Sequence, residues 1–203
     1  MKIALIGISG RVGSRLAAEL LKRGHAVTGI ARDVSNIEPR PSLTVKAADA
    51  NQTESLAPLL EGHDVVVSSS RFVSTDARAV VAAVKKAHVP RLMVVGGAGS
   101  LEVASGLALI NTPEFPEAYK PEARAGIEFL EVLRSEKALD WVFLSPSAEF
   151  EPGERTGRYR LGSDELLVDG QGRSWIAMED YAIAFADELE NPAHSRKRFT
   201  VGY

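Results

Sequence analysis

The chain has 203 residues, a hydrophobic share of 45%, a charged share of 25% and a formal net charge of -3. It is long enough for one buried core, and its balanced charge argues against a broad nucleic-acid-binding surface. The absence of cysteine excludes disulfides and thiolate catalysis, and the four histidines show no metal-ligand spacing. The apolar runs are too short for a signal peptide or a membrane span, so we expect a cytoplasmic protein with no metal, membrane or nucleic-acid partner.

Short β-rich runs alternate with helical segments through the first two-thirds of the chain. An apolar strand at 3–6 is followed by a helix over 11–23. The later predicted strands are 26–31, 43–47, 64–69, 91–95 and 141–144, and the later predicted helices are 54–61, 76–87 and 121–137. Thr53 is the expected cap of the second helix, and residues 96–119 are expected to form a long loop.

This alternation predicts βαβ units with right-handed crossovers. We therefore predict an α/β fold: a single doubly wound Rossmann domain over residues 1–203, with a mainly parallel sheet in the strand order 3-2-1-4-5-6. Residues 146–203 are expected to cap the substrate side. The predicted elements of this cap are strands at 158–161 and 165–168, a turn at 169–170, a helix at 179–190 and a candidate edge strand at 198–201. An edge strand can pair with a second copy, so monomer and homodimer both stay open.

A glycine-rich turn follows the first strand and opens the first helix. Its spacing is G-x-x-G-x-x-G, with the glycines at positions 7, 10 and 13. Such a turn lets a pyrophosphate lie against the free N–H groups and the positive end of the helix. We therefore predict that it binds a nicotinamide dinucleotide. The residues predicted to contact the cofactor here are Gly7, Ser9, Gly10, Arg11, Val12 and Gly13.

The end of the second strand discriminates between the two nicotinamide cofactors. An acidic residue there binds the ribose hydroxyls of NAD, whereas an arginine binds the 2′-phosphate of NADP. Arg32 occupies this place and can form paired hydrogen bonds with phosphate oxygens, and Arg11 can reach the same phosphate. The sequence thus favours NADP. Asp33 can still contact a ribose, which leaves NAD open.

Ligands of open α/β sheets bind at the carboxyl ends of the strands. The segments that follow the third, fourth, fifth and sixth strands are therefore expected to flank the adenine, the ribose and pyrophosphate, and the nicotinamide. Their candidate cofactor-binding residues are Asp49, Ala50, Ser68, Ser69, Gly96, Gly97, Pro146 and Ser147. Serines and glycines are also ordinary loop residues, so a purely structural role stays open for each.

Several longer motifs resemble the atypical short-chain dehydrogenase/reductase superfamily. They are the glycine turn, Val94-Val95-Gly96-Gly97-Ala98-Gly99-Ser100, Tyr119-Lys120-Pro121-Glu122-Ala123, the segment from Ser145 to Gly157, Met178-Glu179-Asp180-Tyr181-Ala182 and the segment from Arg198 to Tyr203. The chain is similar to the branch of small NAD(P)H-binding proteins named NADH-flavin reductases, which is related to NmrA-like proteins and to biliverdin-IXβ reductase. The resemblance covers essentially the whole chain and implies an oxidoreductase.

The chain departs from the superfamily at the catalytic Tyr-x-x-x-Lys pair. In that pair, the lysine lowers the pKa of the tyrosine and orients the ribose. Tyr119 can begin such a motif, but position 123 is alanine, and Lys120 points in another direction on a helix. Tyr119 and Ser100 are the candidate catalytic residues. Alternatively, Tyr119 lines the cleft or packs at the edge of the loop.

The missing lysine favours chemistry that needs little acid–base help from the protein. We therefore expect an NAD(P)H-dependent reductase that prefers NADPH and transfers hydride to a small-molecule acceptor, such as a flavin, a quinone or a similar conjugated compound. One alternative is a non-catalytic NAD(P)-binding sensor of the NmrA-like kind. Another is an enzyme like the nucleotide-sugar epimerases and dehydratases, against which the short C-terminal part argues.

Overall fold

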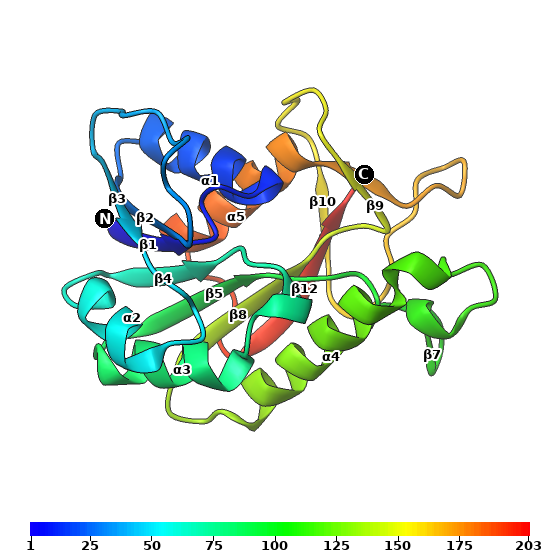
Figure 1. The fold of residues 1–203 in the computed structure, drawn as a ribbon. Helices are drawn as coiled ribbons and strands as arrows, with labels where there is room; N and C mark the ends of the chain where they lie inside the picture. The colour runs from blue at the N-terminus through cyan, green and yellow to red at the C-terminus, as the bar shows by residue number, and fades with distance from the viewer.

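The computed structural model describes residues 1–203 as a twisted sheet between two layers of helices (Figure 1). The main sheet has eight strands in the order β10-β12-β8-β5-β4-β1-β2-β3. Their bounds are β1 Lys2–Ile6, β2 Ala26–Ala31, β3 Leu43–Ala47, β4 Val65–Ser68, β5 Arg91–Val95, β8 Asp140–Ser145, β10 Arg160–Gly162 and β12 Lys197–Gly202. The predicted order is confirmed for the first six strands, which pair in parallel as β3-β2-β1-β4-β5-β8.

The central strands are buried on both faces, which explains their continuous apolar sequences. In β1, Ile3 and Leu5 belong to one hydrophobic cluster, whereas Ala4 and Ile6 belong to the other. The first cluster lies under α1 (Arg11–Lys22) and α5 (Met178–Glu190), and the second under α2 (Thr53–Leu60), α3 (Ala77–Lys86) and α4 (Lys120–Ser135). The two helical layers leave the carboxyl ends of the parallel strands at one edge of the molecule (Figure 1).

The C-terminal part differs from the prediction in its strand pairing. The strand predicted at 198–201 exists as β12, but it lies inside the sheet, parallel to β8 on one side and antiparallel to β10 on the other. The strand predicted at 165–168 is absent. Only Glu165 forms a bridge, and its partner is Glu102 from the distant loop. The turn at Asp169 and Gly170 is present, with the amide of Gly172 donating to the carbonyl of Asp169 over 3.0 Å.

Short elements that the sequence did not predict complete the structure. A second small sheet pairs β9 (Glu149–Glu151) with β11 (Trp175–Ala177), and the loop at 96–119 contains the hairpin of β6 (Glu102–Ala104) and β7 (Leu107–Ala108). The loop also contains the 3₁₀ turns Leu109–Asn111 and Glu117–Tyr119, and a further 3₁₀ turn, Phe72–Ser74, follows β4. No helix has the length and apolar character needed to span a bilayer.

The expected cap of α2 is wrong. Gln52 occupies the capping position and makes no side-chain capping hydrogen bond. Thr53 is instead the first helical residue, and its hydroxyl donates to the carbonyl of Ala79 over 3.1 Å, so it ties α2 to α3. The hydroxyl has therefore been recruited by tertiary packing, which local capping preferences do not describe.

Candidate active site

The glycine turn is held so closely that side chains are excluded from two of its positions. Gly7 has a φ of +87°, and a Cβ placed there would lie 2.6 Å from the carbonyl oxygen of Ser69. A Cβ on Gly13 would lie 2.1 Å from the carbonyl oxygen of Gly7. The turn is fixed to the sheet by the amide of Gly7, which donates to the carbonyl of Ile30 over 2.7 Å. The sequence therefore needs glycine here because α1, β4 and the turn meet backbone to backbone.

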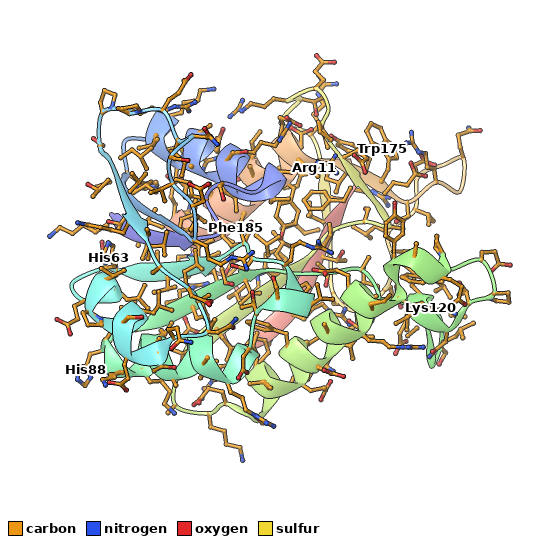
Figure 2. All side chains as sticks on the ribbon, in the orientation of Figure 1. Arg11, His63, His88, Lys120, Trp175 and Phe185 are labelled. Atoms are coloured by element: carbon orange, nitrogen blue, oxygen red, sulfur yellow. The ribbon has the colours of Figure 1, made fainter.

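The start of α1 offers free donors on its exposed side. Gly10 is the N-cap residue, it is exposed, and the first turn of the helix holds no acidic residue. The first N–H groups of a helix have no partner within it, so those of Arg11, Val12 and Gly13 are free for an anion. Ser9 is exposed beside them. The Arg11 side chain crosses to the Glu151 carboxylate in β9, and Figure 2 shows Arg11 at this end of α1.

The end of β2 places Arg32 in solvent with no hydrogen bond or ion pair. One oxygen of the Asp33 carboxylate, Oδ1, accepts hydrogen bonds from the Ser35 amide over 2.9 Å and the Ser35 hydroxyl over 2.7 Å. These bonds to Ser35 hold the pKa of Asp33 below its ordinary value. A groove of about 450 Å³ beside them is lined by Ser9, Asp33 and Arg40, among others. Arg40 was not among the predicted residues, since nothing in the loop at 32–42 distinguishes it.

The segments that follow β3 and β4 approach the glycine turn to different extents. Asp49 and Ala50 are half-buried, and the Asp49 carboxylate is engaged locally by the amide of Asn51 over 3.0 Å. Ser68 is almost completely buried as the last residue of β4. Ser69 contacts the turn directly, and its Oγ atom is buried without a hydrogen-bond partner. Of the four predicted residues, Ser69 is therefore the one that the structure joins to the turn.

The ends of β5 and β8 lie against each other. The amide of Gly96 donates to the carbonyl of Leu144 over 2.8 Å, and a Cβ on Gly96 would lie 2.6 Å from the same oxygen. Gly97 is more open, and its nearest neighbour is the ring of Phe72. Gly96 therefore has a packing reason to be glycine, whereas Gly97 leaves its backbone accessible.

The residues at the end of β8 are more deeply buried than the sequence suggested. Pro146 is buried, and the Ser147 hydroxyl donates to the carbonyl of Val201 over 3.2 Å, so this side chain serves β12. Ser145, which the sequence analysis did not select, has a fully buried Oγ atom without a partner. Any contact of Ser147 with a cofactor would thus be made by its backbone.

The two candidate catalytic residues are not joined by a hydrogen bond. The Tyr119 side chain is 66% exposed and has no hydrogen-bond partner, and Lys120 pairs with Glu117 rather than with Tyr119. Lys120 lies at the start of α4, across the strand ends from α1 (Figure 2). Ser100 accepts a hydrogen bond of 3.3 Å from Nη1 of Arg198, a buried residue of β12. An acid–base pair of the Tyr-x-x-x-Lys type is therefore not assembled.

Ala123 packs against the loop that follows β5. A Cβ on Gly99 would lie 2.9 Å from the Cβ of Ala123, so the loop after β5 packs directly on the first turns of α4. Gly99 is therefore the residue that this contact requires to be without a side chain. The alanine is thus part of a tight contact between loop and helix, which the sequence alone could not reveal.

A buried carboxylate fixes the cap beside the site. Asp180 in α5 is completely buried, and it accepts hydrogen bonds from the amide of Gly157 over 2.8 Å, the hydroxyl of Tyr203 over 2.6 Å and the hydroxyl of Thr156. Arg155 adds a bidentate pair with Glu19 of α1, at 3.0 and 2.9 Å. Residues 155–157 are therefore anchored to both helices that cover this face of the sheet. Only the tertiary fold reveals this network, because its members lie far apart in the sequence.

The residues present fit a dinucleotide. The glycine turn is a cradle without side chains, the first amides of α1 are free, the buried Ser69 hydroxyl lacks a partner, and Arg32 is an unpaired cation at the end of β2. These are the groups that a pyrophosphate and a ribose phosphate require at the carboxyl edge of a parallel sheet.

Comparison with known proteins supports this assignment. A family model described as NAD(P)H-binding matches residues 7–192. The uncharacterized protein YwnB of Bacillus subtilis is 41% identical, over 99% of this chain and 98% of its own length. A Bacteroides thetaiotaomicron structure with the provisional name epimerase is 46% identical, with a TM-score of 0.95 over 100% of this chain and 96% of its own. A Streptococcus pneumoniae structure provisionally named NADH-flavin reductase is 32% identical, with a TM-score of 0.87 over 100% and 99% of the two chains.

The motifs, the strand order and the glycine cradle thus agree with the family match. The predicted resemblance to the atypical short-chain dehydrogenase/reductases is confirmed, and an NAD(P)-dependent oxidoreductase is the class of activity that the fold and the match support. The chain belongs to the NAD(P)H-binding family.

Proposed function

We propose that this protein is a reductase that prefers NADPH and reduces a flavin, a quinone or a similar conjugated acceptor. The observation that carries the proposal is an intact dinucleotide cradle beside a site without an acid–base pair: Ala123 is packed against Gly99, and Tyr119 stands alone in solvent. When bound, the nicotinamide supplies the hydride. The task left to the protein is to orient the two rings and exclude water.

The named relatives leave two chemistries to compare. The provisional name of the Streptococcus pneumoniae relative agrees with a flavin acceptor. The name of the Bacteroides thetaiotaomicron relative would instead favour an epimerase, but the Tyr-x-x-x-Lys pair that standard members of the superfamily use is absent here, because position 123 is alanine. An NAD(P)-binding sensor would need no such pair, and it is the outcome to expect if every acceptor fails.

The preference for NADPH rests on the end of β2. Arg32 has no competing carboxylate, so its guanidinium is available for a 2′-phosphate. One carboxylate oxygen of Asp33, the residue that could favour NAD, accepts the hydrogen bonds of the turn with Ser35. Arg40 lines the adjoining groove together with the acidic residues Asp33 and Glu38, so the preference for a phosphate rests on Arg32.

An acceptor panel tests the proposal. The purified protein is mixed with NADPH, and its oxidation is followed by absorbance after FMN, FAD, a quinone or biliverdin is added. We expect turnover with at least one acceptor, and faster turnover with NADPH than with NADH. Tight NADPH binding without turnover on the whole panel would refute the reductase and favour the sensor. The cytoplasmic location and the choice between monomer and homodimer stay predictions.

A further inference from the structure

A second arginine stands at the carboxyl edge of the sheet, on the opposite side of the glycine turn from Arg32. Arg71 follows β4 two residues after Ser69, which touches Gly7. Its side chain is 77% exposed, and its Nη2 atom lies 3.5 Å from the carboxylate of Glu122 in the first turn of α4. The guanidinium therefore lies between the end of β4 and the start of α4.

The backbone that carries Arg71 is firmly held although its side chain is free. The Glu122 carboxylate accepts hydrogen bonds from the amides of Phe72 over 2.7 Å and Val73 over 3.4 Å. The Phe72 ring packs against α4, where a Cβ on Gly126 would lie 3.0 Å from it. Such anchoring on a rigid element is typical of residues that position a ligand. An exposed ion pair contributes at most about 1 kcal/mol to stability, so the contact with Glu122 leaves the Arg71 guanidinium available to a ligand.

Arg71 lies beside the first turn of α4, next to the residue that precedes the alanine at position 123. The missing lysine of the Tyr-x-x-x-Lys pair would extend from the first turns of α4 towards the nicotinamide ribose, but here position 123 is an alanine that packs against Gly99. Glu122, the adjacent residue on the same helix, instead forms an ion pair with Arg71, which follows β4. A guanidinium donates several hydrogen bonds in a fixed plane and stays charged at all working pH values.

We infer that Arg71 binds the nicotinamide ribose of the cofactor and takes over the ribose-orienting role of the absent lysine. The inference depends on the proposed function only in assuming that the protein binds a nicotinamide cofactor. It does not depend on the identity of the acceptor. Only the ribose-orienting role is assigned to Arg71, because its side chain pairs with Glu122 and forms no hydrogen bond with Tyr119. This assignment is consistent with the isolation of Tyr119.

The experiment compares cofactor fragments rather than rates. Dissociation constants of NADPH, NADH and adenosine 2′,5′-bisphosphate, which lacks the nicotinamide half, are measured by calorimetry for wild type, Arg71→Met, Arg71→Lys and Arg32→Ala. We expect Arg71→Met to raise the dissociation constants of NADPH and NADH by the same factor. This factor should be about tenfold to a hundredfold, as for a lost charge-assisted hydrogen bond. Its affinity for the bisphosphate should not change, and Arg71→Lys should recover part of the loss.

Arg32→Ala should give the opposite pattern. The affinities for NADPH and the bisphosphate should fall, and the affinity for NADH should not change. Arg134→Met is the matched surface control. Arg134 forms an exposed ion pair of 2.7 Å with Glu131 in the last turns of α4, the helix that also carries Glu122, far from the strand ends. Arg71→Met affinities equal to those of wild type, or a loss shared by the bisphosphate, would overturn the inference. Since binding is measured without an acceptor, failure of the reductase assay would not be confused with failure here.

Discussion

Gly13 offers the sharpest test of the glycine cradle. In Gly13→Ala, the added Cβ would lie 2.1 Å from the carbonyl oxygen of Gly7, whereas ordinary contact begins at 3.4 Å. About 1.3 Å must therefore be opened between two stretches of backbone. Neither can yield easily, because the turn is bonded to Ile30 and α1 is packed on the sheet through Leu16 and Leu20.

The expected magnitude combines two opposing terms. Overpacking of this kind costs roughly 1–3 kcal/mol, and alanine in place of glycine within a helix returns up to about 1 kcal/mol. The net loss of unfolding free energy should be about 1–2 kcal/mol. The cost to binding should be larger in proportion, because the amides at the start of α1 move by about an ångström relative to the site of the pyrophosphate. We expect NADPH affinity to fall at least tenfold.

Two other glycines serve as controls. A Cβ on Gly10, the N-cap residue, would lie 3.2 Å from the Gly7 oxygen, so Gly10→Ala should cost about 0.5–1 kcal/mol of stability, less than Gly13→Ala, yet weaken NADPH binding, since this residue faces the expected pyrophosphate. Gly170 has nothing within 4 Å, so Gly170→Ala should change neither property. Urea unfolding and NADPH fluorescence titration measure the two effects. If Gly13→Ala had the stability and the NADPH affinity of wild type, the proposed role of the glycine turn as a close-packed cradle would be refuted.

Three further predictions concern the cap and the cofactor. Asp180→Ala should lower the unfolding free energy by about 3 kcal/mol or more, because Gly157, Tyr203 and Thr156 all lose a buried acceptor, and a loss under about 1 kcal/mol in urea would contradict this. Burial and the bond to Asp180 raise the pKa of Tyr203 to about 12, so the stability from its neutral phenol is complete below pH 10 and is lost as the pH rises towards 12. Tyr203→Phe should therefore flatten the fall of unfolding free energy over that window, and an unchanged slope would refute the assignment. Arg32→Ala should lower the ratio of NADPH to NADH affinity, and an unchanged ratio would remove Arg32 from the phosphate site.

The parallel half of the sheet was predictable because its signals are local. The bounds of β2, β3 and β5 match the expected ranges, since each is a β-rich run bounded by turn or polar residues. The strands of the cap were not predictable in the same way. β9 and β11 have three residues each and are specified by pairing with one another, and the stretch after Asp164 is held by backbone bonds to Glu102 rather than by a neighbour in sequence.

The site shows the same division. The spacing of the glycines was enough to predict the glycine turn, and in the structure these glycines make the expected close backbone contacts. The roles of Glu122 and Arg198 could not be read from the sequence, because each acts on a residue about 50 or 98 positions away: Glu122 on Phe72 and Arg198 on Ser100. Charged residues in helices and strands are common, and only the fold reveals which of them turn inward.

The inner position of β12 makes the order of synthesis matter for this protein. The strands that surround the glycine turn, β1 to β5, are complete by residue 95 and can pair while the chain is still being made. β10 has no strand to pair with until residues 197–202 emerge, and until then β8 presents an open edge. A nascent chain thus acquires its phosphate-binding half early and its cap last. A stalled or clipped polypeptide would carry an unpaired strand edge, which is a template for aggregation.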